Sequence, residues 1–258
     1  MLTRIMNATR MLRTQGPSYT ARYAGQRLLR PLSTRLTELR YERRFGIRTR
    51  GKIQMHSLGI RDPDAIWYEP TSYPGFFNAM RHVVVRGGFV DYGCGLGRAV
   101  VAAAALPFAR IIGVEHSPQL ARRARENVTA ARRIRCRNIE VVCANALDWR
   151  VPDDLTVFHF YNPFVQQTLR AVVAEIARSL RQTPRRAWIV FACPWGMEPL
   201  MRSGQLIPHH WQQRTVDEIW PWYPAVPEDP DSNRYRVYAL DSTRAGPAAA
   251  PPGAERPG

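Results

Sequence analysis

Residues 89–98, FVDYGCGLGR, decide the fold that we expect for this chain. A short apolar run ends in Asp91 and then breaks into glycines at every second position, and a small, helix-favouring run, AVVAAAAL, follows at 99–106. This order is typical of the first strand, turn and helix of a nucleotide-type α/β fold. Glycine is needed in such a turn because the backbone bends sharply and approaches a ligand with no Cβ in the way.

The spacing of the glycines discriminates between cofactors. A dinucleotide-binding fold uses G-x-G-x-x-G, in which the third glycine lets the helix pack on the strand. Gly93 and Gly95 fit that pattern, but Arg98 stands at the third position, and the motif is instead G-x-G-x-G ending at Gly97. Asp91, two residues before Gly93, would repel a pyrophosphate and suits a cationic ligand. S-adenosylmethionine fits this requirement, because it has an ammonium and a sulfonium group and no phosphate.

Further strands are expected to alternate with helices along the chain. Continuous apolar runs predict strands at 110–114, 139–143, 155–160 and 187–192, with an amphipathic helix after the Tyr-Asn-Pro-Phe stretch. Two alternating segments, 210–216 and 234–240, predict an antiparallel pair at the end. We therefore expect an α/β, Rossmann-like sandwich whose seven-stranded sheet is mostly parallel with an antiparallel closing strand.

Local signals mark the elements next to the glycine turn. Glu115 ends the second strand, where its two carboxylate oxygens can accept both hydroxyls of a ribose. Ser117 and Pro118 predict the next helix, as an N-cap followed by proline at the first position. Before the first strand, Pro70 and an apolar side predict a helix over 71–84 that would cap the ligand cleft.

The positive charge of the chain is concentrated near its N-terminus. The formal net charge is +16, and residues 1–50 hold twelve arginines against two glutamates, so +10 lies there and +6 in the other 208 residues. From residue 18 the pattern predicts a basic helix, interrupted by Pro31 and amphipathic after it. We expect a basic, partly helical extension over 1–45, an S-adenosylmethionine-binding domain over 46–243, and a disordered Pro/Ala/Gly tail over 244–258.

The cysteines and the apolar runs suggest a location. The four cysteines have neither CxxC nor Cys/His ligand spacing, which favours reduced thiols in a cytoplasmic protein without a metal site. No apolar run approaches the roughly 20 residues that span a bilayer. We therefore expect a cytoplasmic protein with no transmembrane segment.

Four stretches resemble the motifs of class I S-adenosylmethionine-dependent methyltransferases in order and spacing: DYGCGLGR (91–98), GVEHSPQL (113–120), VVCANALDW (141–149) and FHFYNPF (158–164). More narrowly, Tyr68-Glu-Pro-Thr-Ser, the Gly-Arg end of the glycine motif and Tyr-Asn-Pro-Phe resemble a poorly characterised bacterial group with some likeness to Dot1-type lysine methyltransferases. The resemblance covers roughly residues 45–242 and implies a methyltransferase that uses S-adenosylmethionine.

The resemblance also implies a set of cofactor-binding residues. Asp91 would hold the methionine ammonium, directly or through water, and Glu115 would bind the ribose. Asn145 stands where the family has an acid, so it would accept from the adenine amino group with a neutral carbonyl, which is a weaker acceptor. The full set comprises Tyr68 and Ser72, which would close over the cofactor, Asp91, Gly93, Cys94, Gly95, Gly97, Glu115, Asn145 and Ala146.

The loop after the fourth strand bears on the acceptor. Many amine methyltransferases have Asn/Asp-Pro-Pro-aromatic there, which orients an amine lone pair, whereas this chain has Asn162, Pro163 and Phe164, one proline short. We therefore expect Asn162 to position the methyl acceptor, and we favour an amine in a protein or a small molecule as that acceptor. An O-methyltransferase acting on a small molecule or polysaccharide is the alternative. A general base is needed mainly for a hydroxyl or a protonated amine.

Three residues could supply such a base, but a purely structural role can also explain each of them. His159 lies inside a predicted strand, which favours a packed or hydrogen-bonded core histidine. His116 could merely flank Glu115, and Glu198 could be an ordinary exposed acid. None of the three is assigned a catalytic role.

Two other classes of function compete with a methyltransferase. In the first, the fold is a non-catalytic module, and arginines of residues 18–50 bind nucleic acid or an anionic membrane surface. In the second, the protein is a nicotinamide-dependent oxidoreductase, against which both Arg98 and Asp91 argue. The sequence favours an enzyme that transfers a methyl group to an unidentified acceptor.

Overall fold

The computed structural model describes residues 35–54, 68–161, 163, 166–192, 211–217 and 234–243. The chain divides into two compact units, Met1–Arg44 and Phe45–Gly258. Residues 35–45 form a helix, so part of the predicted basic helix is present. The rest of the extension and the predicted tail lie outside the described residues, and the three-part division stays a prediction. Within the described part, no helix is long and apolar enough to cross a bilayer.

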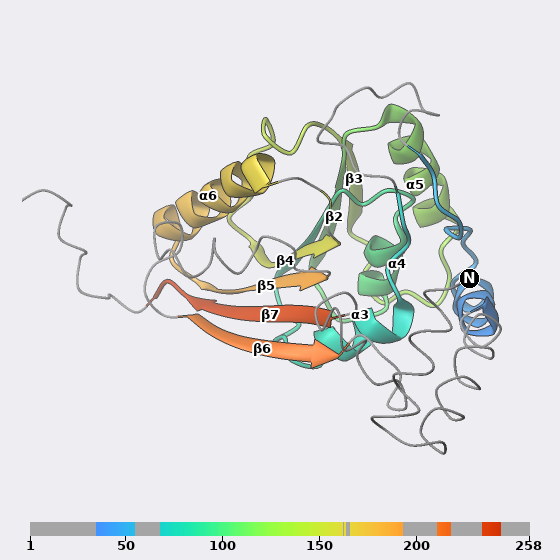
Figure 1. The fold of residues 1–258 in the computed structure, drawn as a ribbon, viewed down its shortest axis with the longest axis horizontal. Coiled ribbons are helices and arrows are strands. Elements are labelled where there is room, and N and C mark those ends of the chain that lie inside the picture. The colour runs from blue at the N-terminus through green and yellow to red at the C-terminus, as the bar shows by residue number, and fades with distance from the viewer. Residues whose placement is uncertain are drawn as a thin grey trace, which may run out of the picture. The chain divides into compact units, whose positions relative to one another are not determined.

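One seven-stranded sheet forms the centre of the second unit (Figure 1). Its order is β3-β2-β1-β4-β5-β7-β6, and β7 is antiparallel to both of its neighbours. The other strands are parallel, which confirms the predicted fold class. The strands are β1 (Gly88–Tyr92), β2 (Arg110–Glu115), β3 (Ile139–Cys143), β4 (Leu155–Tyr161), β5 (Arg186–Ala192), β6 (Trp211–Asp217) and β7 (Arg234–Asp241).

Helices pack on the apolar side chains of these strands, which point alternately to the two faces of the sheet. The helices are α3 (Tyr73–Met80), α4 (Arg98–Ala104), α5 (Pro118–Ala130) and α6 (Gln166–Gln182). Apolar residues of α6 such as Val173 and Ile176 share a core cluster with Val90 and Phe158 of the sheet. Phe76 of α3 instead contacts residues of the opposite face. Figure 1 shows α6 separated from α3 and α4 by the strands.

Helix α3 differs from its predicted extent. It begins at Tyr73, because the hydroxyl of Ser72 caps it by accepting from the backbone N–H of Gly75 at 3.3 Å. Its first-turn proline is therefore Pro74, and the prediction that Pro70 opens the helix was wrong. The helix ends at Met80, four residues earlier than predicted.

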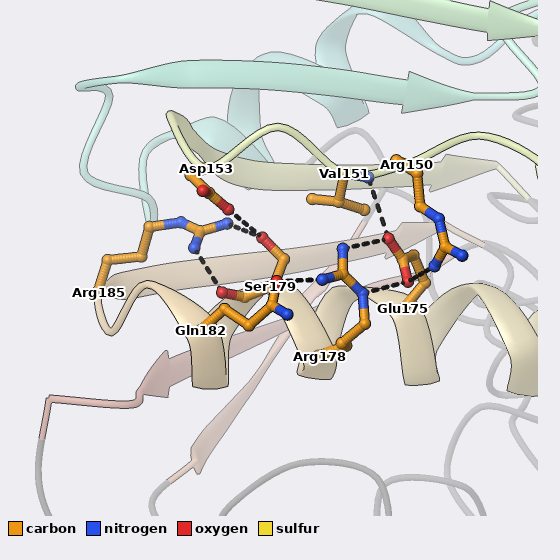
Figure 2. A network of polar contacts seen from close by, with 8 residues as sticks. All are labelled: Arg150, Val151, Asp153, Glu175, Arg178, Ser179, Gln182 and Arg185. Atoms are coloured by element: carbon orange, nitrogen blue, oxygen red, sulfur yellow. Dashed lines mark hydrogen bonds and ion pairs between the residues drawn. The ribbon is translucent and has the colours of Figure 1, made fainter.

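A polar network fixes α6 to the loop before β4 (Figure 2). Glu175 accepts hydrogen bonds from Arg178, from Arg150 at 3.0 Å and from the backbone N–H of Val151 at 3.3 Å. These donors, Arg178 first, lower the pKa of Glu175 to about 2. One turn further along α6, Ser179 links Asp153 to Arg185. The network holds the helix in register with the strand that leads into the predicted acceptor loop.

Candidate cofactor-binding site

The predicted site residues gather at one edge of the sheet. The glycine turn follows β1, Glu115 is the last residue of β2, and Asn145 follows β3. Because β1, β2 and β3 are parallel, their carboxyl ends meet at the same edge. In open α/β sheets this edge is where ligands bind.

The glycine turn joins the end of β1 to the end of β2. The backbone N–H groups of Gly93 and Cys94 both donate to the carbonyl of Val114, at 2.9 and 3.0 Å. Gly93, Gly95 and Gly97 have φ values of +69°, +55° and +79°. L-residues rarely adopt this left-handed conformation, so all three positions favour glycine.

Glu115 is fixed by the turn that it faces. Its Oε2 accepts from the backbone N–H of Gly95 at 2.8 Å, and its Oε1 accepts from that of Ser117 at 2.9 Å. The residue is only 6% exposed, and burial raises the pKa of its carboxyl group, against the lowering effect of these two donors. Each oxygen keeps acceptor capacity, so the carboxylate can still receive two hydroxyl groups.

Asp91 lies beside His159 of the neighbouring strand. The two residues are register partners in β1 and β4, and Asp91 Oδ1 lies 2.7 Å from His159 Nδ1. Both side chains are buried, at 5% and 0% exposure. The interpretation of His159 as a hydrogen-bonded core histidine is confirmed. The pairing itself was missed, although aligning the ends of the predicted strands would have suggested it.

Arg98 is a buried side chain that anchors the turn to the segments before β1. Its Nε donates to Thr49 Oγ1 at 2.8 Å, its Nη1 donates to the carbonyl of Thr71 at 3.0 Å, and its guanidinium lies 4.6 Å from the ring centre of Tyr73. The hydroxyl of Thr71 is in turn 2.5 Å from that of Tyr235 on β7. Sequence reasoning identified Arg98 as the residue in place of the third glycine and as part of the family resemblance, and it gave no signal for these partners.

The electrostatic environment of the turn is negative. Burial raises the pKa of the Cys94 thiol, and the nearby carboxylates of Glu115 and Asp91 raise it further. The thiol therefore stays neutral, and the two acids leave the site suited to a cationic ligand. Residues 89–183, which contain both acids and the turn, match a family model described as a methyltransferase domain. The chain carries a class I S-adenosylmethionine-dependent methyltransferase domain.

Solved structures similar to this methyltransferase domain include three with low identity. Precorrin 8w decarboxylase of Methanobacterium thermoautotrophicum is 12% identical with a TM-score of 0.46, and the match covers 70% of this chain and 95% of that one. An RNA methyltransferase of Salinibacter ruber in complex with S-adenosylhomocysteine is 20% identical with a TM-score of 0.43, and the match covers 73% of this chain and 100% of that one. Magnesium protoporphyrin IX methyltransferase of Synechocystis with bound S-adenosylmethionine is 13% identical with a TM-score of 0.44, and the match covers 65% of this chain and 76% of that one. Similarities of this size do not indicate a substrate. No curated protein matches the chain significantly. None of these comparisons supports the narrower likeness to Dot1-type enzymes.

Tyr68 is brought directly onto the glycine turn of the methyltransferase domain. A Cβ placed on Gly95 would lie 2.3 Å from Tyr68 Cδ2, so the ring rests against this glycine. The hydroxyl of Tyr68 donates to the carbonyl of Thr49 at 2.7 Å, and its backbone pairs in both directions with Ile53. Ser72, the other residue predicted to close over the cofactor, uses its hydroxyl as the N-cap acceptor of α3.

Asn145 and Ala146 lie in the loop after β3 of the methyltransferase domain. The loop is tied to the end of β2, because the backbone N–H of Ala144 donates to the carbonyl of Glu115 at 3.0 Å. The side-chain oxygen of Asn145 accepts from the backbone N–H of Leu147 at 3.0 Å, which leaves one of its lone pairs for a ligand. Ala146 is buried in the core cluster beneath the loop.

The acceptor loop is only partly described. Asn162, Phe164 and Glu198 lie outside the described residues, so the predicted role of Asn162 stays a prediction. Pro163 is described, and a Cβ placed on Gly93 would lie 2.6 Å from its Cβ. The loop after β4 therefore contacts the glycine turn. His116 is exposed beside Glu115.

Proposed function

We propose that this domain transfers the methyl group of S-adenosylmethionine to an amine in a protein or a small molecule, with Asp91 and Glu115 holding the two ends of the cofactor. One observation supports this assignment above the others: two buried carboxylates stand at the carboxyl ends of neighbouring strands, and the glycine turn lies between them. The pair matches a ligand with a ribose at one end and an ammonium at the other.

The proposed cofactor contacts are those that the family resemblance implies. Glu115 would accept the ribose hydroxyls with the lone pairs that its backbone donors leave, and Asp91 would bind the α-ammonium. The backbone of Gly93, Cys94, Gly95 and Gly97 would lie against the methionyl part. Asn145 and Ala146 would contact the adenine, and Tyr68 and Ser72 would cover the cofactor. In this proposal the site residues fit S-adenosylmethionine, because the guanidinium of Arg98, directly after the turn, donates to Thr49 and Thr71 and two carboxylates face the cofactor.

Besides binding the cofactor, the chain must align the acceptor with the methyl group. When bound, S-adenosylmethionine supplies a methyl group on a sulfonium that needs no further activation. The chain must hold the acceptor nitrogen in line with that methyl group, and such positioning can supply much of the rate. Asn162 would orient the amine lone pair with its side-chain oxygen. The contact between Pro163 and the Gly93 region supports this role, because it joins the loop that contains Asn162 to the cofactor turn.

Calorimetric titration with S-adenosylhomocysteine tests the cofactor contacts. We expect Glu115→Gln and Asp91→Asn each to weaken binding by about 10- to 100-fold, since each removes a charge from a hydrogen bond. Glu140→Gln is the matched control, because Glu140 is exposed near the opposite end of β3 and pairs with Arg110. Unchanged affinity in both site variants, or no binding by the intact chain, would refute the assignment.

The acceptor class is tested by transfer of labelled methyl groups to fractions of a lysate. N-methyl amines and O-methyl ethers both survive mild base, so mass spectrometry of the labelled product identifies the methylated atom. Asn162→Ala should abolish transfer without weakening S-adenosylhomocysteine binding. Label in a small molecule or polysaccharide as an O-methyl ether would replace the amine with the O-methyltransferase alternative.

The arginine-rich arm is a separate and less favoured proposal. Residues 18–50 could bind nucleic acid or an anionic surface in a cytoplasmic enzyme, and no comparison bears on either point. Such binding would fall steeply with salt and would disappear when residues 1–50 are deleted. Binding that is unaffected by the deletion would exclude the arm.

A further inference from the structure

A buried histidine lies directly behind the proposed ammonium-binding acid. His159 is fully buried, and its Nδ1 lies 2.7 Å from Asp91 Oδ1. This is the one hydrogen bond that Asp91 makes through its side chain within the described chain, so Oδ2 is left for a ligand. The two residues are direct neighbours across the β1–β4 ladder, which gives the pair little freedom to separate.

The surroundings of His159 favour one tautomer of its ring. The ring packs edge-on against Phe76, with centroids 5.4 Å apart, and stacks on Phe89 at 5.9 Å. Among the described residues, nothing forms a hydrogen bond with its Nε2. A proton on Nε2 would therefore be a buried donor with no acceptor, which is costly. The neutral tautomer with hydrogen on Nδ1 avoids that cost and donates to Asp91.

Packing alone does not account for a histidine here. Its neighbours Phe76 and Phe89 are aromatic, so phenylalanine or leucine would fill the same space without burying an unsatisfied nitrogen. Unlike these apolar residues, His159 can donate a hydrogen bond that fixes the orientation of the Asp91 carboxylate and stabilises its negative charge.

We infer that His159 is a positioning residue that orients Asp91 so that its second oxygen meets the α-ammonium of S-adenosylmethionine. The inference rests on the proposed role of Asp91. Without the Nδ1–H donor, the carboxylate would have to be ordered by the ligand itself, and that ordering would reduce affinity. The effect belongs only to ligands that have an ammonium group.

Two ligands separate this role from a structural one. S-adenosylhomocysteine carries the amino-acid part, whereas 5′-methylthioadenosine has the same nucleoside and no ammonium. By calorimetry, His159→Leu should weaken S-adenosylhomocysteine by about 10-fold or more and leave 5′-methylthioadenosine within about twofold. His159→Asn places an amide N–H near the position of Nδ1 and should restore most of the affinity. Equal losses for both ligands, or no loss for either, would overturn the inference.

Two further measurements keep the result decisive. If His159→Leu does not fold, His159→Phe replaces it, because its ring fits the aromatic surroundings. Nitrogen NMR of the wild-type protein should show a protonated Nδ1 and an unprotonated Nε2, and the opposite tautomer would overturn the inference without any variant. If Asp91→Asn leaves S-adenosylhomocysteine binding unchanged, the proposed role of Asp91 fails, and the inference fails with it. If Asp91→Asn weakens binding and His159→Leu does not, only the role of His159 fails.

Discussion

Replacing Gly95 with alanine tests the close contact between the glycine turn and Tyr68. Gly95 has φ +55°, and an added Cβ would lie 2.3 and 2.4 Å from two ring carbons of Tyr68. The ring cannot move aside easily, because its hydroxyl is bonded to Thr49 and its backbone is paired with Ile53. The substitution should therefore displace the covering segment as well as strain the turn.

The magnitude follows from two separate costs. A left-handed conformation costs an alanine about 1–2 kcal/mol. Overpacking against the ring adds about 1–3 kcal/mol, so the free energy of unfolding should fall by about 2–5 kcal/mol in total. Gly51→Ala is the control, because Gly51 has φ +99° and nothing lies within 4 Å of an added Cβ. Only the conformational cost of about 1–2 kcal/mol applies there.

Urea denaturation of four proteins measures the coupling. The chains are wild type, Gly95→Ala, Tyr68→Ala and the double variant. In the Tyr68→Ala background, Gly95→Ala should cost only about 1–2 kcal/mol, because the ring is gone and the strain remains. The contact is refuted if Gly95→Ala is no more destabilising than Gly51→Ala, or if removing the ring leaves its cost unchanged.

Three further perturbations address the buried polar contacts. Arg98→Lys should lower the free energy of unfolding by about 2–4 kcal/mol, because one ammonium cannot replace the two donors of a guanidinium that is only 2% exposed. Arg123→Lys, on the exposed face of α5, is the control and should have no effect in the same urea assay. Thr71→Val and Tyr235→Phe should each destabilise by about 1–2 kcal/mol and show a coupling of about 1 kcal/mol in a double-mutant cycle; additive effects would exclude the hydroxyl pair. The pKa of Glu175 is lowered to about 2, so the contribution of its carboxylate to the free energy of unfolding is present above its ordinary pKa of 4.5 and is lost as pH falls toward 2. Glu175→Gln should therefore cost about 1–2 kcal/mol at pH 7. In denaturation curves this difference between the variant and the wild type should vanish near pH 2.

The sheet could be predicted from the sequence because β1 to β5 are apolar runs with clear ends, and because polar and apolar residues alternate in the segments that form β6 and β7. The third strand was predicted as observed, 139–143, and the others within about one or two residues. Helix α3 was predicted too long, because apolar residues continue past its end. Val83 is buried but Val84 is 52% exposed, so the pair does not extend the apolar face of a helix. Periodicity cannot distinguish a loop residue that packs inward from a helical one.

The contacts of the candidate site were less predictable than its residues. Asp91 and His159 are 68 residues apart, and only the register of two parallel strands brings them together. Arg98 meets Thr49 and Thr71, which lie 49 and 27 residues away in irregular segments. No repeat or pattern in the sequence encodes such contacts, since they depend on how loops fold over the sheet.

The choice of cofactor depends on where the charges at the glycine turn lie. Arg98 could in principle attract a phosphate, because it is the first residue of α4, directly after the turn. Its guanidinium is instead committed to Thr49, Thr71 and the ring of Tyr73. Two buried carboxylates lie at the turn, Asp91 at 4% exposure and Glu115 at 6%. An acid in the position of Glu115 also binds the ribose of dinucleotides, so only Asp91 discriminates between the two kinds of cofactor. A pyrophosphate would meet this buried anion at a high electrostatic cost, whereas a ligand with an ammonium and a sulfonium would be attracted by it, and this difference favours S-adenosylmethionine over a dinucleotide.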